Sequence, residues 1–210
     1  MSKTNSIRIL IAEDHPVVRE GFAALLDRLE DMTVVGKAST GQEAVALYRQ
    51  LRPDVTLLDL RMPQMDGFAA LSAIRQEFPN ARVIILSTYG GDEDVYRGLR
   101  LGAKAYLLKD APCEQLLETI RAVAAGQTLI ATEMAAKLAE RMSRPELTPR
   151  ELEVLEQIVE GKSNQEIART LSIAESTVKA HVNSILSKLS VGDRTQAVTT
   201  AIRRGIIHME

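Results

Sequence analysis

The chain has few of the features that mark membrane or secreted proteins. It contains one cysteine, Cys113, among 210 residues, which excludes an internal disulfide and is typical of a reducing compartment. No apolar run approaches the roughly 20 residues that a membrane-spanning helix needs. The first six residues hold no hydrophobic core of a signal peptide. We therefore expect a cytoplasmic protein without a membrane partner.

The chain also lacks a strong excess of either charge. Its 26 lysines and arginines stand against 28 aspartates and glutamates, for a net charge of −2. Binding to nucleic acid would therefore have to come from a local patch and not from the chain as a whole. With 45% hydrophobic and 26% charged residues, the composition is globular, and the length suits one large domain or two ordinary ones.

The first part of the chain alternates between apolar runs and segments with helical periodicity. Strands are predicted at residues 7–12, 33–38, 54–59, 82–87 and 105–108, and helices at 16–29, 41–51, 66–77, 93–101 and 113–125. Gly102 and Gly126 follow helical segments, as glycines often do. Cys113 begins the last helix and is interpreted as a small hydrophobic residue. Five βα units predict a doubly wound parallel sheet with helices on both faces.

Strand signals stop near residue 131, and the rest of the chain is predicted to be helical. Residues 131–142 predict a linker helix, which Ser143–Pro145 ends. The next helix starts at an N-cap, Thr148, and stops at Gly161; others are predicted at 164–170, 175–189 and 193–204. We therefore expect an α/β domain (1–126), a linker with a helix (127–145) and an all-α domain (146–210).

Charged and polar side chains stand where four of the predicted strands end. Asp59 ends one strand, Glu13 and Asp14 follow another, and Ser87 and Lys109 stand at the ends of two more. Because ligands of parallel sheets bind at the carboxyl ends of the strands, we expect these side chains to meet at one edge. Such a set has the chemistry for an aspartate that accepts a phosphoryl group beside a divalent metal ion.

The acidic residues of this edge favour a magnesium site. Mg²⁺ prefers hard oxygen ligands, and the candidates are Glu13 or Asp14, Asp59 and a loop carbonyl near Arg61. Clustered carboxylates raise one another's pKa values unless a cation is present. Lys109 would pair with Asp59 and later with the phosphoryl group.

Each of these residues also has an ordinary explanation when it is taken alone. A strand-end aspartate often caps a helix, and a lysine after a strand is usually a solvated charge. Ser87, which would donate a hydrogen bond to a phosphoryl oxygen, adds a third type of group. The conjunction at four strand ends is more specific than any single member and favours the phosphoacceptor hypothesis.

Residues 7–125 resemble the receiver domain of bacterial two-component response regulators. The matching segments are Ile9–His15, Leu57–Gly67, Ile85–Ser87 and Gly102–Lys109. The resemblance implies a flavodoxin-like (βα)5 fold with strand order 2-1-3-4-5. It also implies the following roles: Asp59 as phosphoacceptor, Glu13 and Asp14 as the acidic metal pocket, Ser87 and Tyr106 as a switch pair, and Lys109 as charge partner. Asp110–Ala111 departs from the many receivers that have proline after the lysine.

Helix 175–189 has an apolar side and a polar side. A core stripe is predicted at Val178, Val182, Ile185 and Leu189. A face suited to the DNA major groove carries Ser176, Lys179, Ala180, Asn183 and Ser187. Flanking phosphates would be reached by Thr177, His181 and Lys188. An amphipathic helix in an ordinary bundle is the alternative, although residues from 161 onward hold seven Lys/Arg against four Asp/Glu.

Residues 146–207 resemble the LuxR-type helix-turn-helix domain. The matching segments are Leu147–Leu155, Gly161–Ala168 and Ser176–Val182. The resemblance implies a tetrahelical domain whose third helix reads bases and whose fourth pairs two copies on DNA. It places Lys179, Ala180 and Asn183 where family members contact bases.

The combination of the two domains resembles the NarL/FixJ subfamily of transcription regulators. It implies a sensor histidine kinase that phosphorylates Asp59, and a homodimer on double-stranded DNA with RNA polymerase as a further partner. Phosphorylation would draw Ser87 and Lys109 toward the new oxygens, Tyr106 would rotate inward, and dimerisation or domain opening would change.

Two other functions are left open. A phosphohydrolase of the haloacid dehalogenase type would use Asp59 as nucleophile, but it needs an aspartate two residues later, where this chain has Arg61. A phosphorylation-independent regulator would use the receiver fold for dimerisation, but such chains tend to lack parts of the acidic site. The sequence therefore favours a phosphorylation-controlled regulator over an enzyme.

Overall fold

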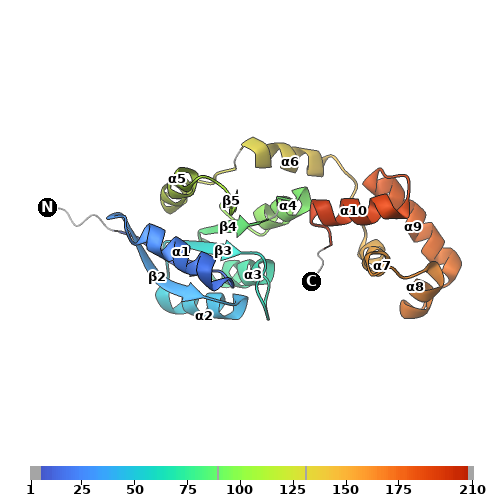
Figure 1. Ribbon diagram of the computed structural model, residues 1–210, viewed down its shortest axis with the longest axis horizontal. Coiled ribbons are helices and arrows are strands. Elements are labelled where there is room, and N and C mark those ends of the chain that lie inside the picture. Colours follow the sequence, from blue (N-terminus) through green and yellow to red (C-terminus); the bar gives the residue numbers. More distant parts are fainter. Residues whose placement is uncertain (1–5, 89, 131, 208–210) are drawn as a thin grey trace. The chain divides into compact units, whose positions relative to one another are not determined.

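The computed structural model describes residues 6–88, 90–130 and 132–207 (Figure 1). Contacts between residues divide the chain into two compact units, and the main division falls after residue 136. The first unit is built on a parallel sheet, and the second consists of helices. Each unit has its own hydrophobic core.

The first unit contains a sheet of five parallel strands. They are β1 (Ile7–Ala12), β2 (Met32–Ala38), β3 (Val55–Asp59), β4 (Val83–Ser87) and β5 (Ala105–Leu108). Their order is β2-β1-β3-β4-β5, which confirms the predicted flavodoxin-like fold. β3 lies at the centre of the sheet, between β1 and β4, so the carboxylate that ends it lies in the middle of the sheet edge.

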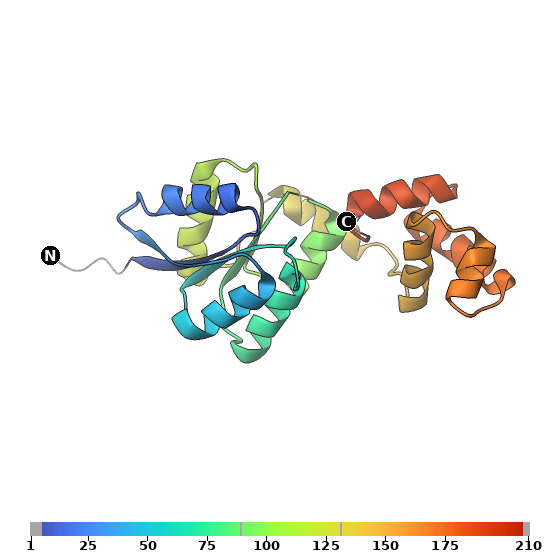
Figure 2. The ribbon, with the colours of Figure 1, turned by 60° about the horizontal axis from the view of Figure 1, so that its bottom comes forward.

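Helices cover both faces of this sheet. They are α1 (Pro16–Leu26), α2 (Gly41–Leu51), α3 (Gly67–Glu77), α4 (Asp92–Arg100) and α5 (Cys113–Ala124). α1 and α5 lie on one face, and α2, α3 and α4 lie on the other (Figure 2). Neighbouring strand residues alternate between the two cores, because Leu58 packs on the α2 side and Leu57 packs on the α1 side. Burial on both faces explains why the strands are apolar throughout.

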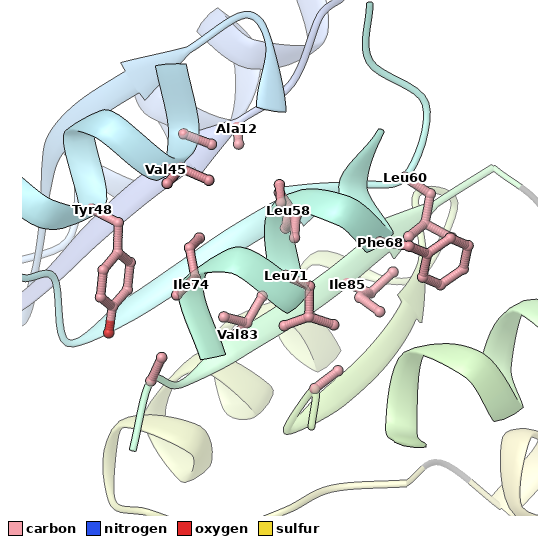
Figure 3. Packing of buried hydrophobic residues seen from close by; sticks show 14 of the residues in the cluster. Ala12, Val45, Tyr48, Leu58, Leu60, Phe68, Leu71, Ile74, Val83 and Ile85 are labelled. Carbon is pink, nitrogen blue, oxygen red and sulfur yellow. The ribbon is translucent and has the colours of Figure 1, made fainter. Parts of the chain in front are cut away.

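Figure 3 shows the core on the α2 and α3 side of the sheet. Val45 of α2 and Leu71 and Ile74 of α3 pack in one cluster with Leu58 of β3 and Ile85 of β4. Each of the five is at most 6% exposed. Burying one such aliphatic side chain contributes about 1.5–3 kcal/mol, so this cluster holds the strand ends firmly against the helices.

The largest difference from the sequence prediction is the end of α1. The periodicity predicts a helix to residue 29, but α1 ends at Leu26. Asp27 accepts a hydrogen bond from the backbone N–H of Val34 at 3.0 Å, so the chain has already turned toward β2. Beyond α5, the backbone N–H of Leu129 donates to the carbonyl of Lys104 at 2.8 Å. The chain therefore stays with the sheet past residue 126.

The second unit is a bundle of short helices that follows α6 (Thr132–Met142). They are α7 (Pro149–Val159), α8 (Asn164–Thr170), α9 (Glu175–Leu189) and α10 (Arg194–Arg204). All four contribute to one core, which includes Val154, Ile167, Val178, Ile185 and Ala201. The predicted cap of α7 is confirmed: Thr148 and Glu151 form a capping box, and Ser163 and Glu166 form another at α8. The second unit is thus the predicted tetrahelical domain.

Candidate phosphoacceptor site and nucleic-acid interface

The carboxyl edge of the sheet brings the predicted polar residues into neighbouring positions. Ala12 of β1 pairs with Leu58 of β3, so Glu13 follows β1 where Asp59 ends β3. Ser87 of β4 pairs with Leu108 of β5, so Lys109 follows on the next strand. The register of parallel strands therefore gathers groups from four separate segments.

Lys109 links the two buried carboxylates of this edge. Its Nζ lies 2.7 Å from Glu13 Oε2 and 3.0 Å from Asp59 Oδ2. The Glu13 and Asp59 side chains are each 2% exposed, and the Lys109 side chain is 15% exposed. One ammonium thus faces two buried carboxylates. One positive charge cannot balance two negative charges, so this cluster keeps an excess negative charge.

Asp59 is under-satisfied in this arrangement. Its Oδ2 has no hydrogen bond that meets full geometric criteria among the described residues, and its close partner is the Lys109 ammonium, an ion pair at 3.0 Å. Burial raises the pKa of Asp59; Lys109 opposes the rise, and the Glu13 carboxylate adds to it. Burial would lower the pKa of Lys109, but its bonds to Glu13 and Asp59 outweigh burial and raise it.

Asp14 and His15 lie on the outer side of Glu13. Asp14 is 28% exposed, and His15 Nδ1 lies 2.8 Å from Asp14 Oδ1 and 3.4 Å from Glu13 Oε1. Arg19 of α1 donates a hydrogen bond of 2.7 Å to the carbonyl of Glu13 and so fixes the acidic turn. The strand-end pattern gives no signal for Arg19, because Arg19 lies on a helix and acts on a backbone carbonyl.

The loop after Asp59 depends on Gly67. A Cβ at Gly67 would lie 2.2 Å from the carbonyl oxygen of Asp59, so a larger residue would have to displace the backbone there. Asp66 caps α3 by accepting a 2.7 Å hydrogen bond from the N–H of Ala69. Together these contacts start α3 directly against the end of β3. The Asp-Gly pair in the quoted motif is the sequence signal for this close approach.

Ser87 and Tyr106 occupy buried positions on β4 and β5. Ser87 is 1% exposed and Tyr106 is 2% exposed. Gly98 lets α4 lie close to Ile85 of β4 and Tyr106 of β5, since a Cβ there would come within 2.5 Å of Ile85 Cδ1 and 3.7 Å of the Tyr106 ring. Tyr106 is buried in this structure, and its inward rotation on phosphorylation stays a prediction.

The residues present fit a divalent cation with oxygen ligands. Ligand atoms of Glu13, Asp14 and His15 all lie within 4.8 Å of one another, and Asp59 adds a buried carboxylate oxygen without a hydrogen bond among the described residues. Asp59 is joined to this group through Lys109. The backbone of Arg61 hydrogen-bonds to the Asp59 carboxylate.

Helix α9 presents the polar face that the sequence predicts. Val178, Ile185 and Leu189 are buried. The exposed positions include Ser176, Thr177, Lys179, Ala180, Asn183 and Ser187, and His181 is half-buried. Lys179 is 62% exposed and pairs with Glu175 at 2.9 Å. The geometry of α8, the turn and α9 is that of a helix-turn-helix motif.

Lys188 does not share this face. Its Nζ donates to Glu151 Oε2 at 2.7 Å and to the carbonyl of Glu146 at 3.0 Å. The hydroxyl of Ser184 donates to Glu151 Oε1 at 2.6 Å. Because its ammonium is held inside the helical unit, Lys188 is better described as a structural residue than as the phosphate contact that the sequence suggests.

Comparison with known proteins identifies the family. The family described as the response regulator receiver domain matches residues 9–121. The family described as bacterial regulatory proteins, luxR family, matches residues 145–201. The chain belongs to the response regulators. Both matches coincide with the regions that the sequence analysis compared with receiver and LuxR-type domains.

Relatives match almost the whole length of this response regulator. The transcriptional regulatory protein YxjL of Bacillus subtilis is 44% identical over 215 residues, covering 97% of this chain and 98% of the relative. The response regulator protein VraR of Staphylococcus aureus is 39% identical over 207 residues, covering 96% and 99%.

A solved structure supports the same placement. RcsB from Salmonella enterica serovar Typhimurium, bound to promoter rprA in the presence of the phosphomimetic BeF3⁻, is similar with a TM-score of 0.66. It is 26% identical, covering 93% of this chain and 98% of that one. This response regulator is a transcription regulator with a receiver domain and a LuxR-type DNA-binding domain. Within the described residues, no helix is long and apolar enough to cross a membrane.

Proposed function

We propose that a sensor histidine kinase phosphorylates Asp59 and that phosphorylation controls promoter binding by α9. The observation that carries this proposal is the state of Asp59. It is 98% buried (2% exposed), it has a raised pKa, and one of its oxygens lacks a hydrogen bond among the described residues. A carboxylate held in this way is destabilised as an anion and is available as a nucleophile.

The chemistry needs a bond from a carboxylate oxygen of Asp59 to phosphorus while the bond from phosphorus to the donor nitrogen breaks. Glu13, Asp14 and Asp59 would hold Mg²⁺, which supplies charge neutralisation for the phosphoryl oxygens when bound. Lys109 already stands beside Asp59 and would follow the charge onto the phosphoryl group. Gly67 keeps the backbone beyond Asp59 in place during this transfer.

Phosphorylation would change the balance of charge at the sheet edge. It adds about −1.5 to −2 charges at Asp59, which competes with Glu13 for the Lys109 ammonium. Ser87 would donate a hydrogen bond to a phosphoryl oxygen. Tyr106, packed beside Gly98 of α4, would then hold the surface of α4 and β5 in one of two arrangements. Such a bias would act on dimerisation or domain opening.

The exposed face of α9 would read the promoter. Lys179, Ala180 and Asn183 would contact bases, and Ser176, Thr177 and His181 would contact the backbone. α10 would pair two copies on double-stranded DNA, and RNA polymerase would be the next partner in the cytoplasm. The RcsB structure, bound to promoter rprA in the presence of BeF3⁻, supports promoter DNA as a partner.

Sedimentation velocity tests the phosphorylation half of this proposal. Wild type and Asp59→Asn are compared with Mg²⁺, each with and without beryllofluoride. We expect a dimer in wild type with the mimic and no change in the variant. A dimer in all four samples, or in none, would show that dimerisation does not depend on Asp59. That result would contradict control of dimerisation by phosphorylation.

Operator binding tests the DNA half. An operator is first selected from random duplex DNA with the wild-type protein. Lys179→Ala should then weaken binding by about 1–3 kcal/mol if Lys179 contacts a base. For the wild-type protein, a plot of the logarithm of the binding constant against the logarithm of the salt concentration should have a slope of about −0.9 per phosphate contact. Unchanged affinity would make Lys179 a solvated residue paired only with Glu175.

A further inference from the structure

Arginines gather at the amino edge of the sheet, opposite the edge that carries the phosphoacceptor site. Arg82 stands directly before β4, and its carbonyl accepts a 2.9 Å hydrogen bond from the backbone N–H of Thr56 in β3. Arg75 lies in the last turn of α3 and donates to the carbonyl of Ala81 at 3.4 Å. A third arginine follows the end of α2. We call these three residues the arginine edge: Arg52, Arg75 and Arg82.

An aromatic ring holds the Arg52 side chain in place. Its guanidinium carbon lies 3.7 Å from the centre of the Phe78 ring, and that ring packs on Tyr48 with centroids 5.2 Å apart. The Nε of Arg52 donates to the carbonyl of Arg49 at 3.0 Å. Its own carbonyl accepts from Arg8 Nη1 at 2.9 Å. Because the guanidinium is already fixed, a ligand would bind it with a smaller loss of side-chain entropy.

The arginine edge has fewer carboxylates than arginines. Among the residues that the structure describes, none of its three side chains forms an ion pair with a carboxylate. The neighbouring Glu77 is paired with Arg49 at 2.6 Å. Asp54 accepts a 2.9 Å hydrogen bond from the backbone N–H of Arg8. Three positive charges therefore stand against the single negative charge of Asp54, and the edge keeps an excess of positive charge.

A buried tyrosine hydroxyl lies beside the same arginines. Tyr48 is 6% exposed, and its hydroxyl has no hydrogen-bond partner in the described part of the chain. Figure 3 shows the ring at the end of the core, with its oxygen turned away from the core. Burial raises the pKa of this hydroxyl; the charges of Arg52, Arg82 and Arg75 oppose the rise, and Asp54 adds to it. Three cations that all act on one hydroxyl must lie around it.

We propose that the arginine edge and the Tyr48 hydroxyl bind a small molecule that carries phosphate groups. Guanidinium groups offer paired N–H donors to phosphate oxygens and stay charged at any physiological pH. The hydroxyl adds a neutral donor. Excess positive charge favours a polyvalent phosphate over a single carboxylate. The site lies at the edge opposite Asp59, so the inference goes beyond the proposed function and does not depend on it.

Nuclear magnetic resonance of arginine side chains tests the site directly. The full chain, labelled with ¹⁵N, is titrated with pyrophosphate in the presence of EDTA, which prevents metal-dependent binding at the other edge. The Nε–H signals of the arginine edge should move together and saturate. The signal of Arg28, an exposed arginine after α1, should not move. Acetate at the same ionic strength should leave all of these signals in place.

Two variants measure what each kind of group contributes. Arg82→Gln should weaken pyrophosphate binding at least about tenfold, because it removes a charge-assisted hydrogen bond. Tyr48→Phe should weaken it about fivefold, because it removes only the hydroxyl. Its ring keeps the packing on Phe78, so this variant should fold even if Arg82→Gln does not. Arg28→Gln is the matched control and should change the affinity by no more than about twofold.

The outcomes separate a built site from ordinary attraction of counter-ions. Equal affinity in wild type, Arg82→Gln and Tyr48→Phe would overturn the proposal, and so would equal shifts with acetate and pyrophosphate. Titration with ADP identifies the source of the phosphate: tighter binding than pyrophosphate indicates a nucleotide, and equal binding indicates an inorganic polyphosphate. Labelling of Asp59 by acetyl phosphate should be the same in Arg82→Gln, so failure of this inference would leave the phosphoacceptor proposal intact.

Discussion

The two domains each bury a carboxylate, and the two carboxylates differ in nearly every physical respect. Asp59 in the receiver domain has an oxygen without a hydrogen bond among the described residues and a pKa raised chiefly by burial. Glu151 in the helical domain is 4% exposed, yet its pKa is lowered to about 2. Burial alone would raise the pKa of Glu151, but its hydrogen bonds reverse the sign.

The difference lies in the number of donors. Glu151 accepts from the ammonium of Lys188, the hydroxyl of Ser184 and the backbone N–H of Thr148. Asp59 accepts from the backbone of Arg61 and shares the ammonium of Lys109 with Glu13. A buried carboxylate with a full set of donors stabilises a fold, whereas one with too few is costly and persists where its reactivity is used.

The largest expected effect is the loss of phosphorylation in Asp59→Asn. Incubation with acetyl phosphate and Mg²⁺ should label wild type and leave the variant unlabelled, because the amide is not a nucleophile. Intact-protein mass spectrometry measures the added phosphoryl mass. Asp66→Asn is the matched control in the same loop, since asparagine also caps a helix. Labelling that persists in Asp59→Asn would move the acceptor to another residue.

The next effect is the loss of stability in Glu151→Gln. A pKa near 2 against 4.5 corresponds to about 3 kcal/mol, and solvent at the partly exposed Lys188 reduces this to about 2 kcal/mol. Hydrogen exchange in peptides from α7 and α9 should become about 30-fold faster. Peptides from β3 and β4 report on the receiver domain in the same sample and should not change.

Glu166→Gln is the matched control for this variant. Glu166 occupies the same place in a capping box, with Ser163, but it is exposed. Among the described residues, its carboxylate accepts hydrogen bonds from Ser163 and from no lysine. Its replacement should leave exchange in α7 and α9 nearly unchanged. Equal effects of the two glutamine variants would show that capping alone, and not the buried ion pair, stabilises the domain.

A smaller effect is the pH dependence of the Glu151 contribution. Because its folded pKa lies below its unfolded value, the stabilisation is fully present above pH 4.5 and is lost as pH falls through about 2. The ratio of exchange rates between Glu151→Gln and wild type should therefore shrink on acidification. A ratio that stays constant down to pH 3 would contradict the assigned shift.

The smallest effect is a gain in receiver stability in Asp59→Asn. The pKa of Asp59 is raised, so its contribution is favourable when protonated and is lost as pH rises through the folded pKa. At pH 7 without metal, the neutral amide should raise the unfolding midpoint followed by tyrosine fluorescence. The difference in unfolding midpoint between Asp59→Asn and wild type should disappear as pH falls toward the pKa of Asp59. A lower unfolding midpoint in the variant would mean that the Asp59–Lys109 ion pair stabilises the domain by more than burial of the carboxylate costs.

Much of the fold follows from local patterns. The apolar runs end at residues that lie at one edge of the folded sheet. Helices also start or end next to the residues that signal it, namely Thr148, Gly102 and Gly126. Of the predicted α9 stripe, Val178, Ile185 and Leu189 are buried, and Val182 is partly buried against the same core. These signals are reliable because caps and periodicity act within one or two turns.

The site was predicted less completely, because its details depend on residues far apart in the sequence. Lys188 lies on the predicted DNA helix, but Glu151, 37 positions away, holds its ammonium. Arg19 acts through a backbone carbonyl, which no residue pattern reveals. His15 lies in the segment Ile9–His15, but only the structure shows that its ring nitrogen is hydrogen-bonded to Asp14.

The sequence by itself determined the elements, the family and the identity of the charged groups at the strand ends. Tertiary structure alone decided which carboxylate is left short of donors and which is fully satisfied. A pattern of residue types states what each group offers, but the pKa of a buried carboxylate depends on the count and distance of donors around it. Those donors come from other strands and helices, so folding sets Asp59 apart from Glu151.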